Sequence, residues 1–302
     1  MSTAFIIGSP RSGTTVLGNI LNCHKQIAEW YEPYYMWAFF LGTHEDDVWE
    51  PAFLTPRARR GIIREYHSFQ KKSGKELIVE KTPGHAFHVR LISEIFPDAK
   101  WIHLLRDGRD ATLSIHREWN KRANMVNDQN YHQLLSTVRN MLIRQPYLKY
   151  RLMALFHEFM TIQSVNPRMY LNKAKWKGQP YWGPRFKGWE SFIAAHSHLE
   201  FNAMQWVKSV EAAQSGLTQI AAENRMEIRY ENLLADPEDV LNSILEYLGH
   251  PADGNFFKAI PRLKAGNSQK WRNAFNADEI EAIKPILTPM LEKTGYLPGV
   301  PW

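Results

Sequence analysis

The chain opens on a short apolar run and a loop that contains two glycines, Ala4-Phe5-Ile6-Ile7-Gly8-Ser9-Pro10-Arg11-Ser12-Gly13-Thr14-Thr15. Four apolar residues that end at a glycine are typical of a buried parallel strand. After the loop, apolar residues recur at helical spacing at Val16, Leu17, Ile20 and Leu21. A strand, a glycine-bearing loop and a helix form the context in which backbone N–H groups and a helix N-terminus bind phosphate. This stretch therefore predicts an α/β fold with an anion site near the start of the chain.

The loop departs at one position from the G-x-x-x-x-G-K-[ST] loop of nucleotide triphosphatases. Gly8 and Gly13 have the required spacing and Thr15 occupies the hydroxyl position, but Thr14 replaces the lysine. In those enzymes the lysine reaches the β- and γ-phosphates of the nucleotide. Here the positive charge has moved to Arg11, and no strand-end aspartate is suited to bind Mg²⁺. The sequence therefore disfavours Mg-ATP hydrolysis.

Three further strands are predicted downstream, at 77–80, 100–105 and 226–230. Helical patterns lie between them, and strands that alternate with helices indicate a parallel, doubly wound sheet. We expect an α/β fold of three layers, with a mostly parallel central sheet and P-loop-like topology. No composition break marks a second domain, so residues 1–302 are interpreted as one. The aromatic and acidic stretch at 29–37 has loop character around its proline.

Residues 125–200 interrupt this alternation. Two helical stripes, at 134–142 and 155–160, are separated by Pro146, and a Gly/Pro/Trp-rich segment follows at 175–189. We interpret the block as a helical and aromatic insertion that caps the carboxyl edge of the sheet.

The charge balance favours anionic partners. The net charge is +6 at pH 7 and the pI is about 9.2. Nucleic acid, an anionic membrane surface and a polyphosphorylated nucleotide all fit this balance. We interpret the excess as spread along the chain rather than gathered into a block of like charges, so a nucleic-acid-binding tail is not predicted.

The sequence also bears on location. Cys23 is the one cysteine, which excludes an intrachain disulfide and a cysteine-cluster zinc site and favours a reducing compartment. No apolar run approaches the ~18 residues that a membrane-spanning helix needs. The first strand begins so early that we expect no signal peptide before it. We therefore predict a cytoplasmic protein without a membrane span, and we expect no metal because no ligand spacing suits one.

Two clusters of polar residues follow predicted strands. Arg106 follows the strand at 100–105, and Ser114 would face the first turn of a helix that starts near Asp110. Arg106, Ser114 and that helix N-terminus are suited to share one phosphate. Lys81 follows the strand at 77–80, with His85 close behind. A lysine at this edge is suited to neutralise a bridging oxygen.

A basic loop at 266–272 forms the last cluster. It carries Ser268, Lys270 and Trp271, a combination suited to a phosphate and to the face of a purine. Taken alone, each of these clusters is also compatible with an ordinary surface turn or connecting loop.

Taken together, the clusters resemble the PAPS-dependent sulfotransferases. Residues 5–21 are similar to the 5′-phosphosulfate loop of that family, in the Pro-Arg-Ser-Gly-Thr-Thr form of tyrosylprotein sulfotransferases and many bacterial relatives. Residues 96–114 resemble its 3′-phosphate motif, residues 229–249 its Arg-Tyr-Glu motif, and residues 266–271 its C-terminal loop over the nucleotide. The resemblance implies transfer of a sulfuryl group from PAPS to a hydroxyl-bearing acceptor, with PAP as product.

The resemblance also implies individual roles. The residues expected to bind the nucleotide are Arg11, Ser12, Gly13, Thr14, Thr15, Arg106, Ser114, Tyr230, Ser268, Lys270 and Trp271. Lys81 matches the family lysine near the leaving group, and Glu32 falls where the tyrosylprotein enzymes carry their catalytic glutamate. The cytosolic small-molecule enzymes use a histidine at the position that Pro83 occupies here. Because His85 is close, the choice of base between it and Glu32 stays open, and Arg11 joins the expected catalytic group.

Two other classes of function remain open at this point. One is a P-loop enzyme that transfers phosphoryl groups, and the other is a non-catalytic protein that binds anions or nucleic acid. Neither explains all the clusters at once. The acceptor is also open between a glycan, a lipid, a small molecule and tyrosine, with the insertion expected to lie over the acceptor site.

Overall fold

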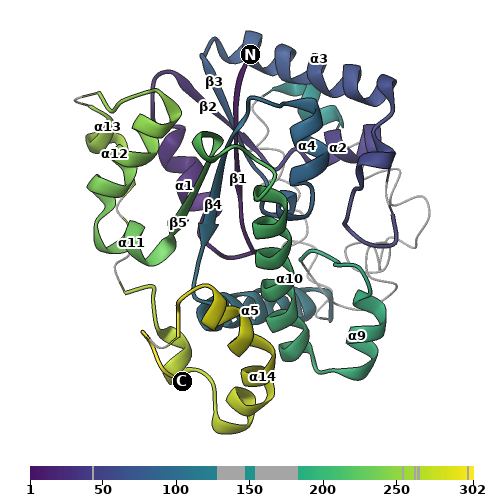
Figure 1. Ribbon diagram of the computed structural model, residues 1–302, viewed down its shortest axis with the longest axis vertical. Coiled ribbons are helices and arrows are strands. Elements are labelled where there is room, and N and C mark those ends of the chain that lie inside the picture. The colour runs from purple at the N-terminus through teal and green to yellow at the C-terminus, as the bar shows by residue number, and fades with distance from the viewer. Residues whose placement is uncertain are drawn as a thin grey trace.

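The computed structural model describes residues 1–42, 44–127, 147–153, 183–253, 255–261, 263, 266–297 and 299–302. A parallel sheet of five strands forms its centre, in the order β2-β3-β1-β4-β5 (Figure 1). The strands are β1 Ser2–Ile7, β2 Ile27–Tyr31, β3 Leu77–Lys81, β4 Lys100–Leu105 and β5 Arg225–Arg229. The predicted α/β fold with a parallel central sheet is confirmed.

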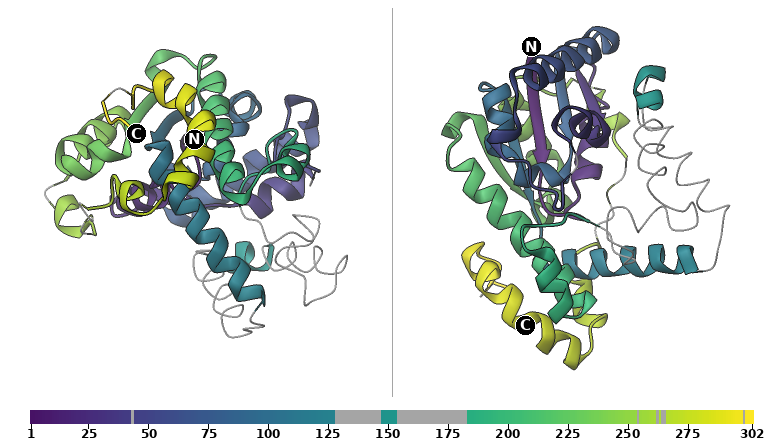
Figure 2. Two further views of the ribbon diagram at one scale, coloured as in Figure 1. Left: turned by 90° about the horizontal axis from the view of Figure 1, so that it is seen from below. Right: turned by 90° about the vertical axis from the view of Figure 1, so that its right-hand side faces the viewer.

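Helices cover both faces of the sheet, which makes the three layers (Figures 1 and 2). The α-helices are α1 Thr14–Leu21, α2 Tyr34–Leu41, α3 Pro56–Ser73, α4 Val89–Ile95, α5 Gly108–Asn127, α9 Trp189–Ala195, α10 His198–Leu217, α11 Tyr230–Ala235, α12 Pro237–Leu248, α13 Phe256–Ala259 and α14 Ala277–Lys293. Short 3-10 helices span η1 Pro51–Phe53, η2 Pro83–Phe87, η4 Ala222–Asn224 and η5 Lys270–Asn273.

The first strand illustrates why the sheet is buried on both sides. Successive side chains of a strand point to opposite faces. Ala4 and Ile6 accordingly pack into the cluster formed with α1 and α12, whereas Phe5 packs into the cluster formed with α3, α4 and α10. All three side chains are fully buried. An apolar residue at every position is what a central strand needs when helices cover both of its faces.

The stretch that sequence patterns indicated to be a loop contains two elements instead. β2 ends at Tyr31, and α2 begins at Tyr34, directly after Pro33. The strand lies at the edge of the sheet, has only five residues and includes Glu29, so it lacks the continuous apolar run of the central strand β1. The helix is apolar on nearly every side, so it shows no amphipathic period. Proline does mark the boundary, because at a helix start its missing N–H costs no hydrogen bond within the helix.

Other expected boundaries are close to the observed ones. Tyr230 begins α11 rather than ending β5, and Asp236 caps the start of α12 with a side chain that accepts from the N–H of Asp239. The predicted helical stripes at 134–142 and 155–160 lie outside the described residues, as does most of the block at 125–200.

Candidate active site

Residues 8–13, which we call the phosphate loop, connect β1 to α1 in a compact turn. A Cβ on Gly8 would stand 2.5 Å from the carbonyl oxygen of Leu104, so the backbones approach too closely for a side chain. Gly13 caps α1 with a left-handed φ of 94°. The hydroxyls of Ser9 and Ser12 are 2.6 Å apart and hold the two halves of the loop together. Because the first N–H groups of a helix have no partner within the helix, this turn presents donors to an anion.

The loop meets the cluster that follows β4. Arg11 Nε donates to Ser114 Oγ at 3.1 Å, and Arg106 Nη1 donates to the carbonyl oxygen of Arg11 at 2.9 Å. β1 and β4 are neighbouring parallel strands, so their carboxyl ends reach the same edge of the sheet. Two cations, a hydroxyl and two helix N-termini therefore gather within one small region. Arg11 is exposed there, whereas Arg106 is only 5% exposed.

The Arg106 guanidinium joins three segments. Besides its bond to the phosphate loop, its Nη2 donates to the carbonyl oxygen of Asn267 at 2.8 Å, and the group lies 4.9 Å from the Tyr230 ring centroid. Its Nε is buried and has no hydrogen-bond partner among the described residues. A buried cation with an unused donor is costly unless an anion completes it. This orphaned donor beside the loop suits a phosphate ligand.

The C-terminal loop is anchored by a residue that sequence analysis did not assign. The Asp110 carboxylate accepts from the backbone N–H groups of Gln269, at 2.5 Å, and Trp271, at 3.1 Å. Burial raises the pKa of Asp110 above its usual value, with Arg106 acting in the opposite direction. An aspartate in the first turn of a helix is ordinarily interpreted as a capping residue, so the sequence gives no sign of this longer-range contact.

Asn267 and Lys270 complete the loop. Asn267 Nδ2 donates to the hydroxyl of Tyr230 at 2.9 Å, and Lys270 Nζ donates to Asn267 Oδ1 at 2.7 Å. The Tyr230 ring also faces Gly13, where a Cβ would stand 2.4 Å from it. Ser268 is half-buried in the same loop. Asn267 and Lys270 of the C-terminal loop therefore lie beside the phosphate loop.

Trp271 occupies a different position from the one expected. Its side chain is 1% exposed and packs in the cluster with α10 and α14. The Arg109 and Arg272 guanidinium groups lie 4.4 Å and 4.8 Å from its ring centroid, and Trp302 lies edge-on to it. A ring covered in this way has no free face for a purine. The expectation of purine stacking is corrected: Trp271 contributes its backbone N–H to the anchor on Asp110.

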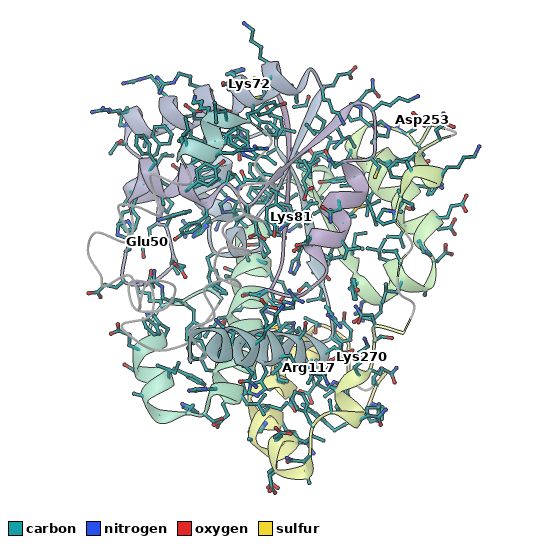
Figure 3. The ribbon with its side chains drawn as sticks, turned by 180° about the vertical axis from the view of Figure 1, so that it is seen from behind. Glu50, Lys72, Lys81, Arg117, Asp253 and Lys270 are labelled. Carbon is teal, nitrogen blue, oxygen red and sulfur yellow. The ribbon has the colours of Figure 1, made fainter. Side chains whose placement is uncertain are left out.

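Glu32 and Lys81 form an ion pair at the ends of β2 and β3. Lys81 Nζ donates to Glu32 Oε1, and the Glu32 N–H donates to the Lys81 carbonyl oxygen at 3.0 Å. Lys81 is fully buried and its ammonium lies 3.6 Å from the Tyr31 ring centroid, whereas the Glu32 side chain is 39% exposed. Figure 3 shows Lys81 near the centre of the molecule. Solvent and substrate can reach the Glu32 carboxylate. The Lys81 ammonium that holds it is buried and is not easily displaced by either.

His85 lies apart from this pair. It is fully buried, with Nε2 2.7 Å from Glu80 Oε1 and Nδ1 2.9 Å from His88 Nδ1. Glu80 and Lys81 are successive residues of β3 and point to opposite faces of the sheet. With both ring nitrogens occupied and no exposed surface, His85 is not placed to meet an acceptor. The structure thus favours Glu32 over His85 as the candidate base.

Glu80 is the centre of a buried polar network that sequence analysis missed. Its carboxylate accepts from Trp37 Nε1 at 3.1 Å, from Thr82 Oγ1 at 2.7 Å and from the Tyr66 hydroxyl, in addition to its contact with His85. Burial and the Glu80 charge raise the pKa of Tyr66 well above its usual value. The donors come from α2, α3 and η2, so the network fixes the strand end that carries Lys81.

The model of the family described as "Sulfotransferase family" matches residues 4–162 and 182–254, which include the phosphate loop, Glu32, Lys81, Arg106 and Ser114. The chain belongs to the sulfotransferase family.

Curated relatives of this family member are distant. It is 22% identical over 320 aligned positions to Omega-hydroxy-beta-dihydromenaquinone-9 sulfotransferase Stf3 of Mycobacterium tuberculosis, with 86% of this chain and 65% of Stf3 covered. It is 28% identical over 130 residues to nodulation protein NoeE of Sinorhizobium fredii, with 38% of this chain and 31% of NoeE covered. The chain thus spans less than two thirds of either relative.

A solved structure agrees on the fold. The sulfotransferase domain from the curacin biosynthetic pathway has a TM-score of 0.53 at 15% identity, with 96% of this chain and 97% of that domain covered. Within the described ranges, no group of three or more His, Cys, Asp and Glu side chains is arranged to hold a metal ion.

Proposed function

We propose that the protein transfers a sulfuryl group from PAPS to a hydroxyl of an acceptor and releases PAP. The observation that carries the proposal is the meeting of Arg11, Arg106 and Ser114 at one edge of the sheet, with the Lys81–Glu32 pair at the same edge. These groups provide two anion sites and a base on adjacent strand ends. Family membership supplies the reaction class.

Each anion site has its own residues. Arg11, Ser12, Gly13, Thr14 and Thr15 hold the 5′-phosphosulfate at the N-terminus of α1, where the N–H groups point outward. Arg106, Ser114 and Lys270 hold the 3′-phosphate, to which Arg106 presents its unused Nε. Tyr230 and Ser268 position the loop that covers the nucleotide.

The reaction forms one bond and breaks one. The acceptor oxygen attacks sulfur, the bond from sulfur to the bridging oxygen breaks, and PAP leaves with the added negative charge. Glu32 takes the acceptor proton. Arg11, which is exposed, and Lys81, through the electrostatic field of its buried ammonium, stabilise the charge that develops on the bridging oxygen. Because Glu32 is partly exposed and Lys81 is buried, the carboxylate is the member of the pair that meets the acceptor.

The acceptor is a hydroxyl compound. Stf3 is named for a hydroxylated menaquinone derivative, which makes a lipid hydroxyl one candidate beside glycans, small molecules and tyrosine. A cytoplasmic location also remains a prediction, to be checked by cell fractionation.

The proposal is tested by calorimetric binding of PAP and by incubation with labelled PAPS and pools of lipids, glycans, metabolites and peptides. We expect PAP to bind without Mg²⁺, and labelled product to form in one pool. Glu32→Gln should keep PAP affinity and lose turnover. A larger thermal shift with Mg-ATP than with PAP would instead support phosphoryl transfer. Salt-sensitive nucleic-acid binding without any sulfated product would support a non-catalytic binder.

A further inference from the structure

The third helix concentrates the positive charge of the chain. Residues 56–75 contain seven Lys or Arg residues and one Glu, a net charge of +6 that equals the net charge of the whole protein. The excess is gathered on this helix, which corrects the expectation that it is spread along the chain rather than gathered into a block of like charges. The single carboxylate, Glu65, is 4% exposed and is paired with Lys149 at 2.6 Å.

The cations on α3 form one outward face. Arg57, Arg60, Arg64 and Lys71 recur at intervals of three, four and seven residues, which places them on one side of the helix, and all four are exposed. We call these four residues the basic face. The buried residues Ala58, Ile62, Tyr66 and Phe69 lie on the opposite side. Arg64 Nε is 4.0 Å from Glu65. The cations of the basic face repel one another because they are three, four and seven residues apart on one side of the helix, so an anionic partner would stabilise this face.

Exposed apolar side chains border the basic face. Leu148 and Leu152 are 70% and 56% exposed and lie one turn apart in the helical segment 148–153. This segment lies beside α3, because Lys149 pairs with Glu65 and Lys72 lies 5.3 Å from the Tyr150 ring centroid.

A third exposed apolar residue lies at the end of α2. Phe39 is 63% exposed and contacts Phe40, which packs so closely on α3 that a Cβ on Gly61 would stand 2.2 Å from it. Large apolar side chains on a protein surface next to a row of cations match the composition of an interfacial membrane site.

The basic face is separate from the candidate active site. Figures 1 and 2 show α3 along the end of the molecule where β1 begins, whereas the phosphate loop follows the other end of β1. In Figure 3, Lys72 projects at the outer edge and Lys81 lies near the centre. A planar partner bound to α3 would leave the carboxyl edge of the sheet open to nucleotide.

We propose that the basic face of α3, with Leu148, Leu152 and Phe39 beside it, binds the surface of an anionic lipid bilayer. The cations neutralise lipid headgroups, and the apolar side chains enter the interface. Nucleic acid would satisfy the cations but offers nothing to two exposed leucines. Binding of this kind is peripheral: within the part of the chain that the structure describes, no helix combines the length and apolar character required to traverse a bilayer.

The test is flotation of the purified protein with vesicles of 30% phosphatidylglycerol and 70% phosphatidylcholine, and with vesicles of phosphatidylcholine alone. We expect binding to the anionic vesicles, weakened by raising NaCl from about 0.1 M to about 0.5 M, and little binding to the neutral ones. Each cation at a membrane surface contributes about fivefold in affinity, so the triple variant Arg60→Gln, Arg64→Gln, Lys71→Gln should bind on the order of a hundredfold more weakly.

A matched variant controls for net charge. Lys258→Gln, Lys284→Gln, Lys293→Gln removes three exposed lysines from α13 and α14 and should bind anionic vesicles nearly as well as the original chain. Leu148→Ser with Leu152→Ser should bind more weakly but keep the salt dependence. PAP affinity should be unchanged in all variants, which separates this proposal from the proposed function.

The proposal is overturned by equal losses in the two triple variants, by equal binding to neutral vesicles, or by unchanged binding of the leucine variant. It is also overturned if a 20-base-pair DNA duplex binds to α3 while anionic vesicles do not.

Discussion

The ammonium group of Lys81 donates a hydrogen bond to the carboxylate of Glu32, although 49 residues separate the two along the chain. The contact follows from the sheet, since Tyr31 and Lys81 are paired across the neighbouring parallel strands β2 and β3. Glu32 itself leaves the strand with a φ of 38°, a left-handed conformation that turns its side chain toward the lysine. The two side chains therefore form one hydrogen-bonded ion pair.

Substitutions in this pair should show that coupling. Glu32→Gln should lower kcat by about 10²–10⁴ and Lys81→Met by about 10²–10³, because one removes the proposed base and the other the charge that we propose stabilises the leaving oxygen. The double variant should lose much less than the product of the two effects. The measurement is kcat for the four members of the cycle, with PAP affinity as a check on folding. Fully multiplicative losses would show that the two residues act independently.

The grouping of residues that follow strands was predictable from the sequence, because the carboxyl ends of parallel strands meet at one edge of the sheet. Arg11, Arg106 and Ser114 belong to motifs that each adjoin a predicted strand, and the structure brings them together. Glu32 was assigned by resemblance alone, since the pattern of β2 did not reveal a strand.

The direction of side chains beyond the strand ends was not predictable. His85 and Trp271 belong to the expected motifs, yet both are buried in the core. The alternation of side-chain direction along a strand does not extend to a residue a few positions beyond its end. The orientation of such a residue therefore depends on tertiary packing. The same holds for Glu80, whose donors come from elements far apart in the sequence.

Ser114→Ala should weaken PAP binding modestly. The substitution removes a hydroxyl that accepts from Arg11 Nε and that we propose also binds the 3′-phosphate. A neutral or charge-assisted hydrogen bond of this kind contributes about 1–2 kcal/mol, so the Kd for PAP should rise about fivefold to thirtyfold. Calorimetry at fixed salt measures the change. Thr218→Ala, at the end of α10, is the control and should leave the Kd unchanged. An unaltered Kd in Ser114→Ala would remove this residue from the proposed site.

Gly13→Ala should disable the phosphate loop. The φ of 94° strains any residue with a Cβ, and that Cβ would collide with the Tyr230 ring at 2.4 Å. We expect a fall of about 1–3 kcal/mol in the free energy of unfolding and loss of PAP binding. Gly84→Ala is the matched control, because a Cβ there meets no atom within 4 Å. Urea unfolding and PAP titration of both variants provide the measurement. Normal PAP affinity in Gly13→Ala would show that the loop tolerates a side chain at this position.

Glu80→Gln should destabilise the fold despite its similar shape. The amide would turn a donor toward one of the donors from Trp37, Tyr66 and Thr82, and one of those buried groups would lose its acceptor. Breaking a buried network of this kind costs about 3–5 kcal/mol. Glu76→Gln, on the exposed start of the same segment, should stay within about 0.5 kcal/mol of the original chain. Chemical denaturation followed by tryptophan fluorescence distinguishes the two, and equal stability would mean that the network contributes little.

His88 should make the folded state sensitive to acid. Burial, followed by the neighbouring His85, lowers the pKa of His88 from the ordinary value of 6.5 to about 3. Between these two values the unfolded chain takes up a proton that the folded chain does not, so stability is full above about pH 6.5 and is lost as the pH falls toward about 3. One such group changes the free energy of unfolding by about 1.4 kcal/mol per pH unit, which amounts to about 2 kcal/mol between pH 7.5 and pH 5. His88→Gln should lose this part of the pH dependence, whatever its stability at pH 7.5, whereas His67→Gln on the exposed side of α3 should keep it. Urea unfolding at pH 7.5, 6 and 5 gives the slopes, and identical slopes for the two variants would show that His88 is not the group that responds to acid.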